Sequence, residues 1–147
     1  MSNLNDQHPD SSMLAPIERM VRFMETLDHS WLAEVFTTED VILLDSFAPF
    51  VFQGRNGVGI WAHNFAKHVG GLIGLRHEFG EAQEFSRSGD TVFFSQPIIW
   101  KGANNEVPFT ETGGLAVVLT KQGADWRIRN FAWAVTAYAE TRLKIRS

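Results

Sequence analysis

The sequence predicts an α+β fold in which helices from the first half of the chain pack against a curved, mainly antiparallel sheet with a mixed edge. Two observations lead to this prediction. Apolar residues recur at helical spacing in three segments before position 70, and four long β-rich segments joined by short polar turns fill most of the remainder. The expected order is three helices around one early strand, followed by a long meander of strands.

Three amphipathic segments predict the helices. The first runs from about residue 11 to residue 28, with Ser12 as its cap and Pro16 in the first turn, where proline is tolerated. A shorter helix follows over about residues 30–36. The third ends at Gly70 and Gly71, and its apolar positions are Val58, Ile60, Trp61, Phe65 and Val69.

Strands are predicted where β-branched and aromatic residues cluster. Short extended pieces cover 41–44 and 50–52, and longer strands cover 76–85, 91–100, 107–120 and 126–138. The turns at 88–90 and 121–125 are polar and contain Gly, which predicts antiparallel hairpins. Paired glycines weaken a flat strand but allow curvature, so Gly113 and Gly114 predict a bulge or sharp bend. A bent sheet with helices across its concave side encloses a volume.

Length and composition favour a single domain over residues 11–140 of the 147, with a disordered lead-in over 1–10 and a C-terminal tail over 141–147. The chain has no cysteine, which excludes thiol nucleophiles, disulfides and thiolate metal sites and fits a reducing compartment. The polar start lacks the apolar stretch of a secretory signal, and no apolar run approaches the roughly 20 residues that span a membrane. We therefore expect a cytoplasmic protein. A net charge of −4 with scattered basic residues disfavours nucleic acid as a partner.

Three segments carry a resemblance to a known family. Residues 41–45 form a strand that ends in Asp45, and Gly54 and a helix with Trp61 follow. The chain closes with Trp126, Arg127, Ile128 and Trp133, and an amphipathic helix pair opens it. In order and spacing, these segments resemble the SnoaL-like and ketosteroid isomerase-like members of the nuclear transport factor 2-like superfamily over roughly residues 13–138.

The resemblance implies the cone-shaped, cystatin-like fold of that superfamily. It further implies a pocket for a small hydrophobic molecule between the helices and the concave face, and a homodimer that packs through the outer face of the sheet. The reaction is much less constrained, because one scaffold here serves isomerases, cyclases, dehydratases, hydrolases and proteins without catalysis.

Asp45 is the first candidate for chemistry, because it matches the position of the general-base aspartate in ketosteroid isomerase-like enzymes. Beside Phe47, Phe50 and Phe52, its carboxyl would be partly desolvated, and desolvation raises the pKa of a carboxyl toward that of a useful base. An Asp after a strand also commonly caps a turn by accepting from nearby backbone N–H groups. Both interpretations remain open at this point.

The oxyanion donors of the ketosteroid isomerases have no counterpart here. Alignment from the end of the first helix places Phe23 where those enzymes have a tyrosine. Counting back from the turn at 121–123 places Leu115 where they have a protonated acid. Neither side chain can donate a hydrogen bond, so the resemblance implies a different substrate or reaction.

Histidines are the substitute donors. His63 and His68 lie on the third predicted helix and His77 on the strand after it, and a neutral imidazole can serve as base, acid or donor near pH 7. Each also fits an exposed surface position. We take Asp45, His63 and His68 as the candidate catalytic residues. A spacing of five does not place His63 and His68 on one helix face, so no metal site is expected.

Aromatic and small residues complete the predicted pocket. Asn130 is included because residues 128, 130, 132 and 134 form a slim face of the last strand, although it also fits a surface position between two arginines. Glu111 is predicted to face solvent at the rim. The candidate ligand-binding residues are Phe23, Phe47, Phe52, Trp61, Phe65, Trp100, Leu115, Asn130 and Trp133.

Taken together, these residues predict a small-molecule enzyme of the isomerase, cyclase or dehydratase type. It would need no cofactor and would use Asp and His as general acid and base on a hydrophobic carbonyl or hydroxyl compound. The alternative is a non-catalytic domain that binds a ligand or forms a dimer. The missing oxyanion donors favour the alternative, whereas Asp45 favours the enzyme.

Overall fold

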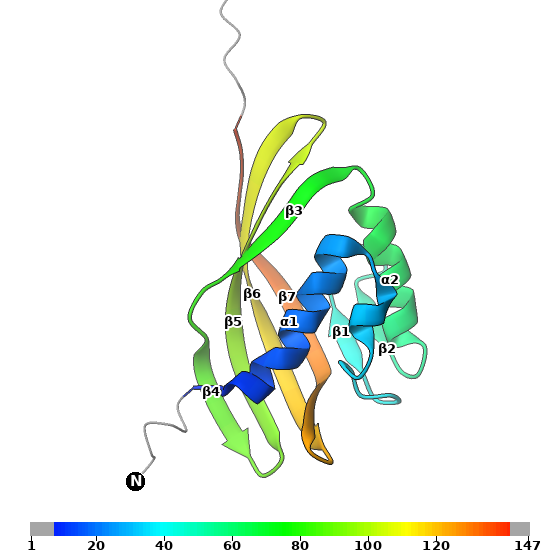
Figure 1. The fold of residues 1–147 in the computed structure, drawn as a ribbon, viewed down its shortest axis with the longest axis vertical. Helices are drawn as coiled ribbons and strands as arrows, with labels where there is room; N and C mark the ends of the chain where they lie inside the picture. The colour runs from blue at the N-terminus through cyan, green and yellow to red at the C-terminus, as the bar shows by residue number, and fades with distance from the viewer. Residues whose placement is uncertain (1–7, 142–147) are drawn as a thin grey trace, which may run out of the picture.

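One curved sheet of seven strands carries two α-helices on one of its faces (Figure 1). The computed structural model describes residues 8–141, so residues 1–7 of the predicted lead-in and 142–147 of the predicted tail lie outside the described residues. The strands follow the order β2-β1-β7-β6-β5-β3, and β4 also pairs with β5. Their bounds are β1 (Ile42–Leu44), β2 (Val51–Gln53), β3 (Leu72–Phe79), β4 (Gln83–Ser88), β5 (Thr91–Asn104), β6 (Val107–Gln122) and β7 (Asp125–Glu140).

Most pairing follows the hairpins that the turns predict. Strands β4 and β5, β5 and β6, and β6 and β7 are antiparallel neighbours, whereas β1 runs parallel to β7. The sheet is therefore mixed, and the α+β class is confirmed. The register of β6 against β7 shifts between Thr112 and Gly113, which confirms the predicted bulge.

Helix α1 (Ser11–Thr26) is capped by Asp10, the residue that precedes its first turn. The Asp10 carboxylate accepts from the backbone N–H groups of Ser12 at 3.0 Å and Met13 at 3.2 Å, so Asp10 is the cap in place of the predicted Ser12. Leu27 ends the helix in the left-handed region, with φ of 60°. The buried face of the helix carries Met13, Pro16, Ile17, Met20, Val21 and Phe23.

The second predicted helix is not confirmed. Its place is taken by η2 (His29–Leu32), a single 3-10 turn capped by Asp28. Val35 and Phe36 leave the helical path to pair with a distant strand: the Ile128 N–H donates to the Val35 carbonyl at 2.8 Å, and Phe36 forms a parallel bridge with Ile128. Long-range pairing has therefore replaced the local helical preference.

Helix α2 (Gly57–His68) matches the third prediction and buries Trp61 and Phe65. It starts where the chain leaves β2, and an added Cβ at Gly57 would lie only 3.0 Å from Val41 and 3.1 Å from the Phe52 backbone. Gly57 thus lets the helix approach the first hairpin closely.

The predicted strand at 76–85 is two strands, because the edge of the sheet breaks at Gly80. Strand β3 pairs with the second half of β5 and β4 with its first half. At the break, Pro97 has no N–H to offer, and its carbonyl accepts from the Gly80 N–H at 2.9 Å. The buried Gln96 amide donates to the carbonyls of Gly80 at 2.7 Å and Pro97 at 3.0 Å, and so joins the two segments.

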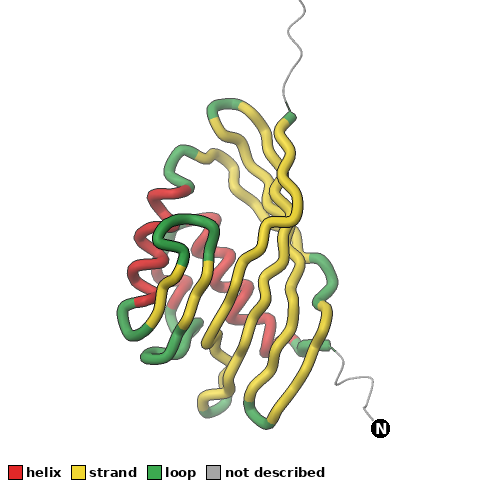
Figure 2. Tube along the Cα trace, turned by 180° about the vertical axis from the view of Figure 1, so that it is seen from behind, coloured by secondary structure: helices red, strands yellow, loops and turns green. Residues whose placement is uncertain are grey.

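The core lies between the helices and the sheet. Seen from behind, the sheet turns its uncovered face to the viewer while both helices lie across its other face (Figure 2). The aromatic side chains of Phe23, Trp61 and Phe65 form the centre of this core, with ring centroids 5.7–6.1 Å apart. Within residues 8–141, no helix combines the length and apolar content needed to cross a lipid bilayer.

Candidate functional site

An apolar cavity of about 310 Å³ lies between the two helices and the curved sheet. Met20 and Met24 from α1 and Trp61, Phe65 and His68 from α2 form one wall, and inward side chains of β5, β6 and β7 form the other. Among residues 8–141, neither a Lys nor an Arg side chain lines the cavity. The polar side chains in the lining are Asp45, Ser46, His68, Asn104, Glu111 and Tyr138, beside the indole of Trp133.

Asp45 lies at the end of β1 and lines the cavity. Its Oδ2 accepts from the indole Nε1–H of the fully buried Trp61 at 2.9 Å, and its Oδ1 accepts from the Ser46 backbone N–H at 2.7 Å. The carboxyl therefore both holds its own turn and faces the apolar interior. Burial raises the pKa of Asp45, although the hydrogen bonds from Trp61 and Ser46 and the charge of His68 oppose that rise.

Glu111 is the second carboxyl of the cavity, and the sequence-based expectation of a solvent-facing rim position missed it. It lies on β6 and is half-buried, and it lines the cavity together with Trp133, whose indole favours the charged form of its carboxyl. Burial raises its pKa first, and the negative charge of Asp45 raises it further, against the opposing effects of Trp133 and His68. The alternation on β6 could have found it, because Phe109, Gly113 and Leu115 are the buried positions of the same face.

His68 completes the polar side of the cavity, from the last turn of α2. Its imidazole stacks on Phe47 with ring centroids 5.1 Å apart and planes inclined by 24°. Its charge acts on both Asp45 and Glu111. The residue is also exposed, so it lies where the cavity meets solvent. His63 lies on the same helix but is exposed and does not line the cavity, because the inward face of α2 carries Trp61, Phe65 and His68.

The structure brings six of the nine predicted ligand-binding residues to the cavity wall. Phe23 does not reach the cavity, because Trp61 and Phe65 lie in front of it at 5.8 and 6.1 Å between ring centroids. Phe52 packs behind Phe47 at 5.5 Å. The six that line the cavity are Phe47, Trp61, Phe65, Trp100, Leu115 and Trp133.

Asn130 lies outside the cavity, and a bulge explains why. The register of β6 against β7 shifts between the pairs Leu119–Ile128 and Val118–Asn130, so the side chains beyond Ile128 change sides. Asn130 therefore does not share the inward face of Ile128, and its amide lies 3.5 Å from the Ile42 carbonyl. The bulky Phe131 and Trp133 face the cavity in its place.

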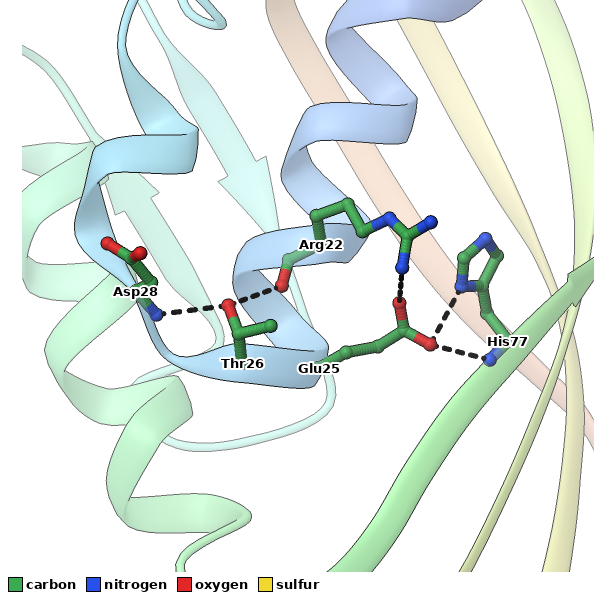
Figure 3. Close-up of polar contacts among 5 residues, drawn as sticks. All are labelled: Arg22, Glu25, Thr26, Asp28 and His77. Atoms are coloured by element: carbon green, nitrogen blue, oxygen red, sulfur yellow. Dashed lines mark hydrogen bonds and ion pairs between the residues drawn. The ribbon is translucent and has the colours of Figure 1, made fainter.

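A polar contact between α1 and β3 supports the wall that Met24 and Leu75 line (Figure 3). Glu25 Oε2 accepts from the His77 backbone N–H at 3.1 Å and lies 3.0 Å from His77 Nδ1, and Glu25 Oε1 lies 3.8 Å from Arg22. The His77 ring also packs at 5.8 Å from the ring of Trp100, which lines the cavity. His77 is thus a structural residue of the wall.

The residues that could ligate a metal do not gather around a common point. Across the described part of the chain, no group of three or more His, Asp or Glu side chains is arranged to hold an ion. The arrangement of Asp45, Glu111 and His68 instead suits proton transfer inside an apolar space.

Comparisons with known proteins identify the fold. No family model matches the chain, and no curated protein matches it in sequence. Among solved structures, a type 2 hexachlorocyclohexane dehydrochlorinase superposes with a TM-score of 0.75 at 10% identity, over 93% of this chain and 91% of that one.

Two further solved structures superpose on this chain over most of its length. A candidate scytalone dehydratase from Novosphingobium aromaticivorans has a TM-score of 0.68 at 13% identity, with 90% of this chain and 89% of that one covered. A candidate ketosteroid isomerase from Shewanella frigidimarina has a TM-score of 0.67 at 14% identity, with 85% and 96% covered. The curved mixed sheet, the covering helices and these superpositions show that the chain has the fold of the nuclear transport factor 2-like superfamily, the family that its sequence resembles.

Proposed function

We propose that this protein is an enzyme that moves protons on a small, apolar, uncharged compound with a carbonyl or hydroxyl group, as an isomerase, cyclase or dehydratase. The observation that carries the proposal is a pair of carboxyls, Asp45 and Glu111, in one apolar cavity, with Asp45 hydrogen-bonded by the Trp61 indole and Glu111 stabilised in its charged form by the Trp133 indole. The chemistry requires only proton transfer, so it calls for no cofactor.

The two carboxyls differ in their readiness to ionise. The two carboxyls interact, because the charge of Asp45 raises the pKa of Glu111. We assign the carboxylate to Asp45, both of whose oxygens accept hydrogen bonds, and the retained proton to Glu111. Over the pH range between the two ionisations, the cavity holds one carboxylate and one carboxylic acid. Asp45 is then the general base and Glu111 the general acid.

These roles define a reaction sequence. Asp45 takes a proton from a C–H group next to a carbonyl, and the carbonyl oxygen accepts the hydrogen bond or the proton of Glu111. Return of the proton to another carbon completes an isomerisation. In a dehydration, the electron pair of the broken C–H bond forms the new double bond, and the hydroxyl leaves as water with the Glu111 proton. Asp45 then holds the proton that Glu111 needs, and the exposed His68 is placed to relay it.

The cavity lining indicates the class of substrate. An apolar cavity of about 150 Å³ accommodates benzene, so about 310 Å³ suits a compound of roughly two rings. The lining includes neither Lys nor Arg and contains two carboxyls, which disfavours anionic substrates. Trp61, Trp100 and Trp133 favour an aromatic or alicyclic body.

The structural neighbours support a reaction of this type by analogy of fold. The names of the three superposed proteins describe an elimination of hydrogen chloride, a dehydration and an isomerisation on small molecules. A shared fold does not fix a reaction, so the argument for this chain rests on its own two carboxyls.

The test uses exchange with deuterated water. The protein is incubated with a mixture of uncharged one- and two-ring keto and hydroxy compounds, and mass spectrometry follows deuterium uptake and water loss. We expect Asp45→Asn and Glu111→Gln each to slow the reaction by about 10²–10⁴-fold, the usual contribution of a positioned acid or base.

His63→Gln is the matched control, because His63 is exposed on the same helix as His68 and lies outside the cavity. Its rate should equal that of the unaltered protein. Equal rates in Asp45→Asn and the unaltered protein would remove the aspartate from the mechanism. Compounds that bind without exchange or water loss would establish the non-catalytic ligand-binding alternative.

A further inference from the structure

We propose that Gly113 and Trp133 together form a positioning device that holds the Glu111 carboxyl toward the cavity. Gly113 provides the space in which the Trp133 ring lies, and the ring in turn presents its N–H to Glu111. The inference rests on the proposed function, because it assigns the residues that position the proposed acid.

Gly113 is a buried glycine whose missing side chain makes room for Trp133. An added Cβ would lie 2.6 Å from the Cζ2 and Cη2 atoms of the Trp133 ring and would also meet the Ala134 carbonyl oxygen. Real Cβ atoms essentially never approach other atoms so closely, so any other residue at 113 would displace the ring. The neighbouring Gly114 differs, since its added Cβ would meet only the Ser95 hydroxyl oxygen at an ordinary 3.5 Å.

The register of the sheet explains how Trp133 reaches Glu111. Trp133 is paired with Leu115, and Gly113 is the next inward position along β6 toward Glu111. The indole lies over Gly113 with its Cζ2 edge, which adjoins the ring N–H, and both Trp133 and Glu111 line the cavity. The indole favours the charged form of the Glu111 carboxyl. Position 113 therefore needs a glycine, because the Trp133 ring passes over it.

A bulge fixes this arrangement. Gly113 pairs with Val135 and Thr112 with Ala137, so Thr136 is an extra residue on β7. Its hydroxyl donates to the Thr112 carbonyl at 3.1 Å, which closes the irregular part of the ladder. Thr136 therefore pins the strand segment that carries Trp133 against the segment that carries Glu111.

The experiment measures the Glu111 carboxyl directly and needs no substrate. Protein labelled with ¹³C at the Glu carboxyls is titrated by NMR, and Glu111→Gln identifies the Glu111 signal. The five tryptophan indole N–H signals are followed in the same titration, and Trp133→Phe identifies that of Trp133.

The expected result is a Trp133 indole signal that shifts together with the Glu111 titration. Loss of the donor in Trp133→Phe removes a stabilising contact from the charged carboxylate, so the Glu111 midpoint should move to higher pH. Gly113→Ala should move it in the same direction, and the matched control Gly114→Ala should leave it unchanged.

Two outcomes separate this inference from the proposed function. A Glu111 midpoint that is the same in the unaltered protein and in Trp133→Phe would overturn the positioning role, whatever the activity. A coupled Trp133 and Glu111 titration in a protein that exchanges no compound would establish the positioning of the carboxyl and overturn the enzymatic proposal. Trp133→Phe keeps the test decisive even if Gly113→Ala does not fold.

Discussion

At the scale of single residues, burial of Asp45 links the stability of the protein to pH. The folded protein holds the pKa of this carboxyl above its ordinary value of 3.8, because burial penalises the charged form. Below pH 3.8 the carboxyl is protonated in both states and contributes nothing. As pH rises, the unfolded chain releases the proton first, so the free energy of unfolding falls through the interval from 3.8 to the folded pKa.

Asp45→Asn should remove this dependence. We expect the difference in unfolding free energy between the variant and the unaltered protein to shift in favour of the variant as pH rises through that interval. The measurement is urea unfolding over a pH series in a Glu111→Gln background, which removes the carboxyl that is coupled to Asp45, so that the titration of groups outside the cavity cancels in the comparison. A difference that stays constant with pH would show that the Asp45 carboxyl is not desolvated.

At the scale of elements, Glu25 and His77 join α1 to the edge strand β3 (Figure 3). Their side chains are only 13% and 18% exposed, so solvent screens the contact weakly. The Glu25 carboxylate accepts from the His77 backbone N–H and lies beside its imidazole. Removal of this carboxylate would leave the partly buried N–H without a partner. The same wall carries Met24 and Leu75, which line the cavity.

Glu25→Ala is therefore expected to lower the free energy of unfolding by about 1–3 kcal/mol, the cost of leaving a buried donor unsatisfied. The control is Glu78→Ala. Glu78 is 60% exposed and its carboxylate lies 3.5 Å from Lys101, so this variant should change stability by less than about 1 kcal/mol. Urea unfolding of both variants provides the comparison. Equal losses would contradict a special role for the contact between α1 and β3.

Local sequence patterns predicted the elements whose residues interact with near neighbours. The periodicity of α1 and α2 and the two Gly-containing turns describe interactions within a few residues, and the structure contains these elements. The segment of Val35 and Phe36 was predicted as helix but is extended, because it pairs with Ile128. Ile128 lies more than ninety residues further along the chain. No local pattern reports such a pairing.

Local sequence patterns also predicted only part of the candidate site. Asp45 was found because it matches the position of the family's general-base aspartate, and the strand, aspartate and glycine that carry this match lie close together in the sequence. Asn130 was placed on the inner face by strict alternation, which the bulge after Ile128 interrupts. Glu111 was assigned to the rim, because the side of the sheet on which a strand residue lies depends on the register against its neighbours. The sequence predicted Asp45, one half of the carboxyl pair. Alternation along β6 puts Glu111 on the face of Phe109 and Leu115, and the register shows that this face is the inner one.

At the scale of the whole molecule, the outer face of the sheet has a composition unlike the rest of the surface. Outward side chains alternate with the cavity-lining residues of β6 and β7, and all of them except Arg127, near the β6–β7 turn, are small and uncharged. Phe93 on β5 adds a large apolar side chain that is 41% exposed. The outward residues of the two strands are Thr110, Thr112, Gly114, Ala116, Val118 and Thr120 on β6 and Arg127, Asn130, Ala132, Ala134, Ala137 and Ala139 on β7.

We propose that a second copy of the chain covers this face, as the family resemblance implies. On this face of β6 and β7 the charges are confined to the end near the β6–β7 turn, where Arg127 lies. Such a surface loses little hydration when it is buried and gains free energy from the apolar area removed from water. Analytical ultracentrifugation should then show a dimer.

The variant Ala134→Arg should shift this dimer to the monomer, because two copies of the new charge would be buried near each other without partners. Ala124→Arg is the control, because Ala124 is exposed in the β6–β7 turn, away from this face, and should leave the dimer intact. A monomer for the unaltered chain, or an intact dimer for Ala134→Arg, would contradict pairing through this face.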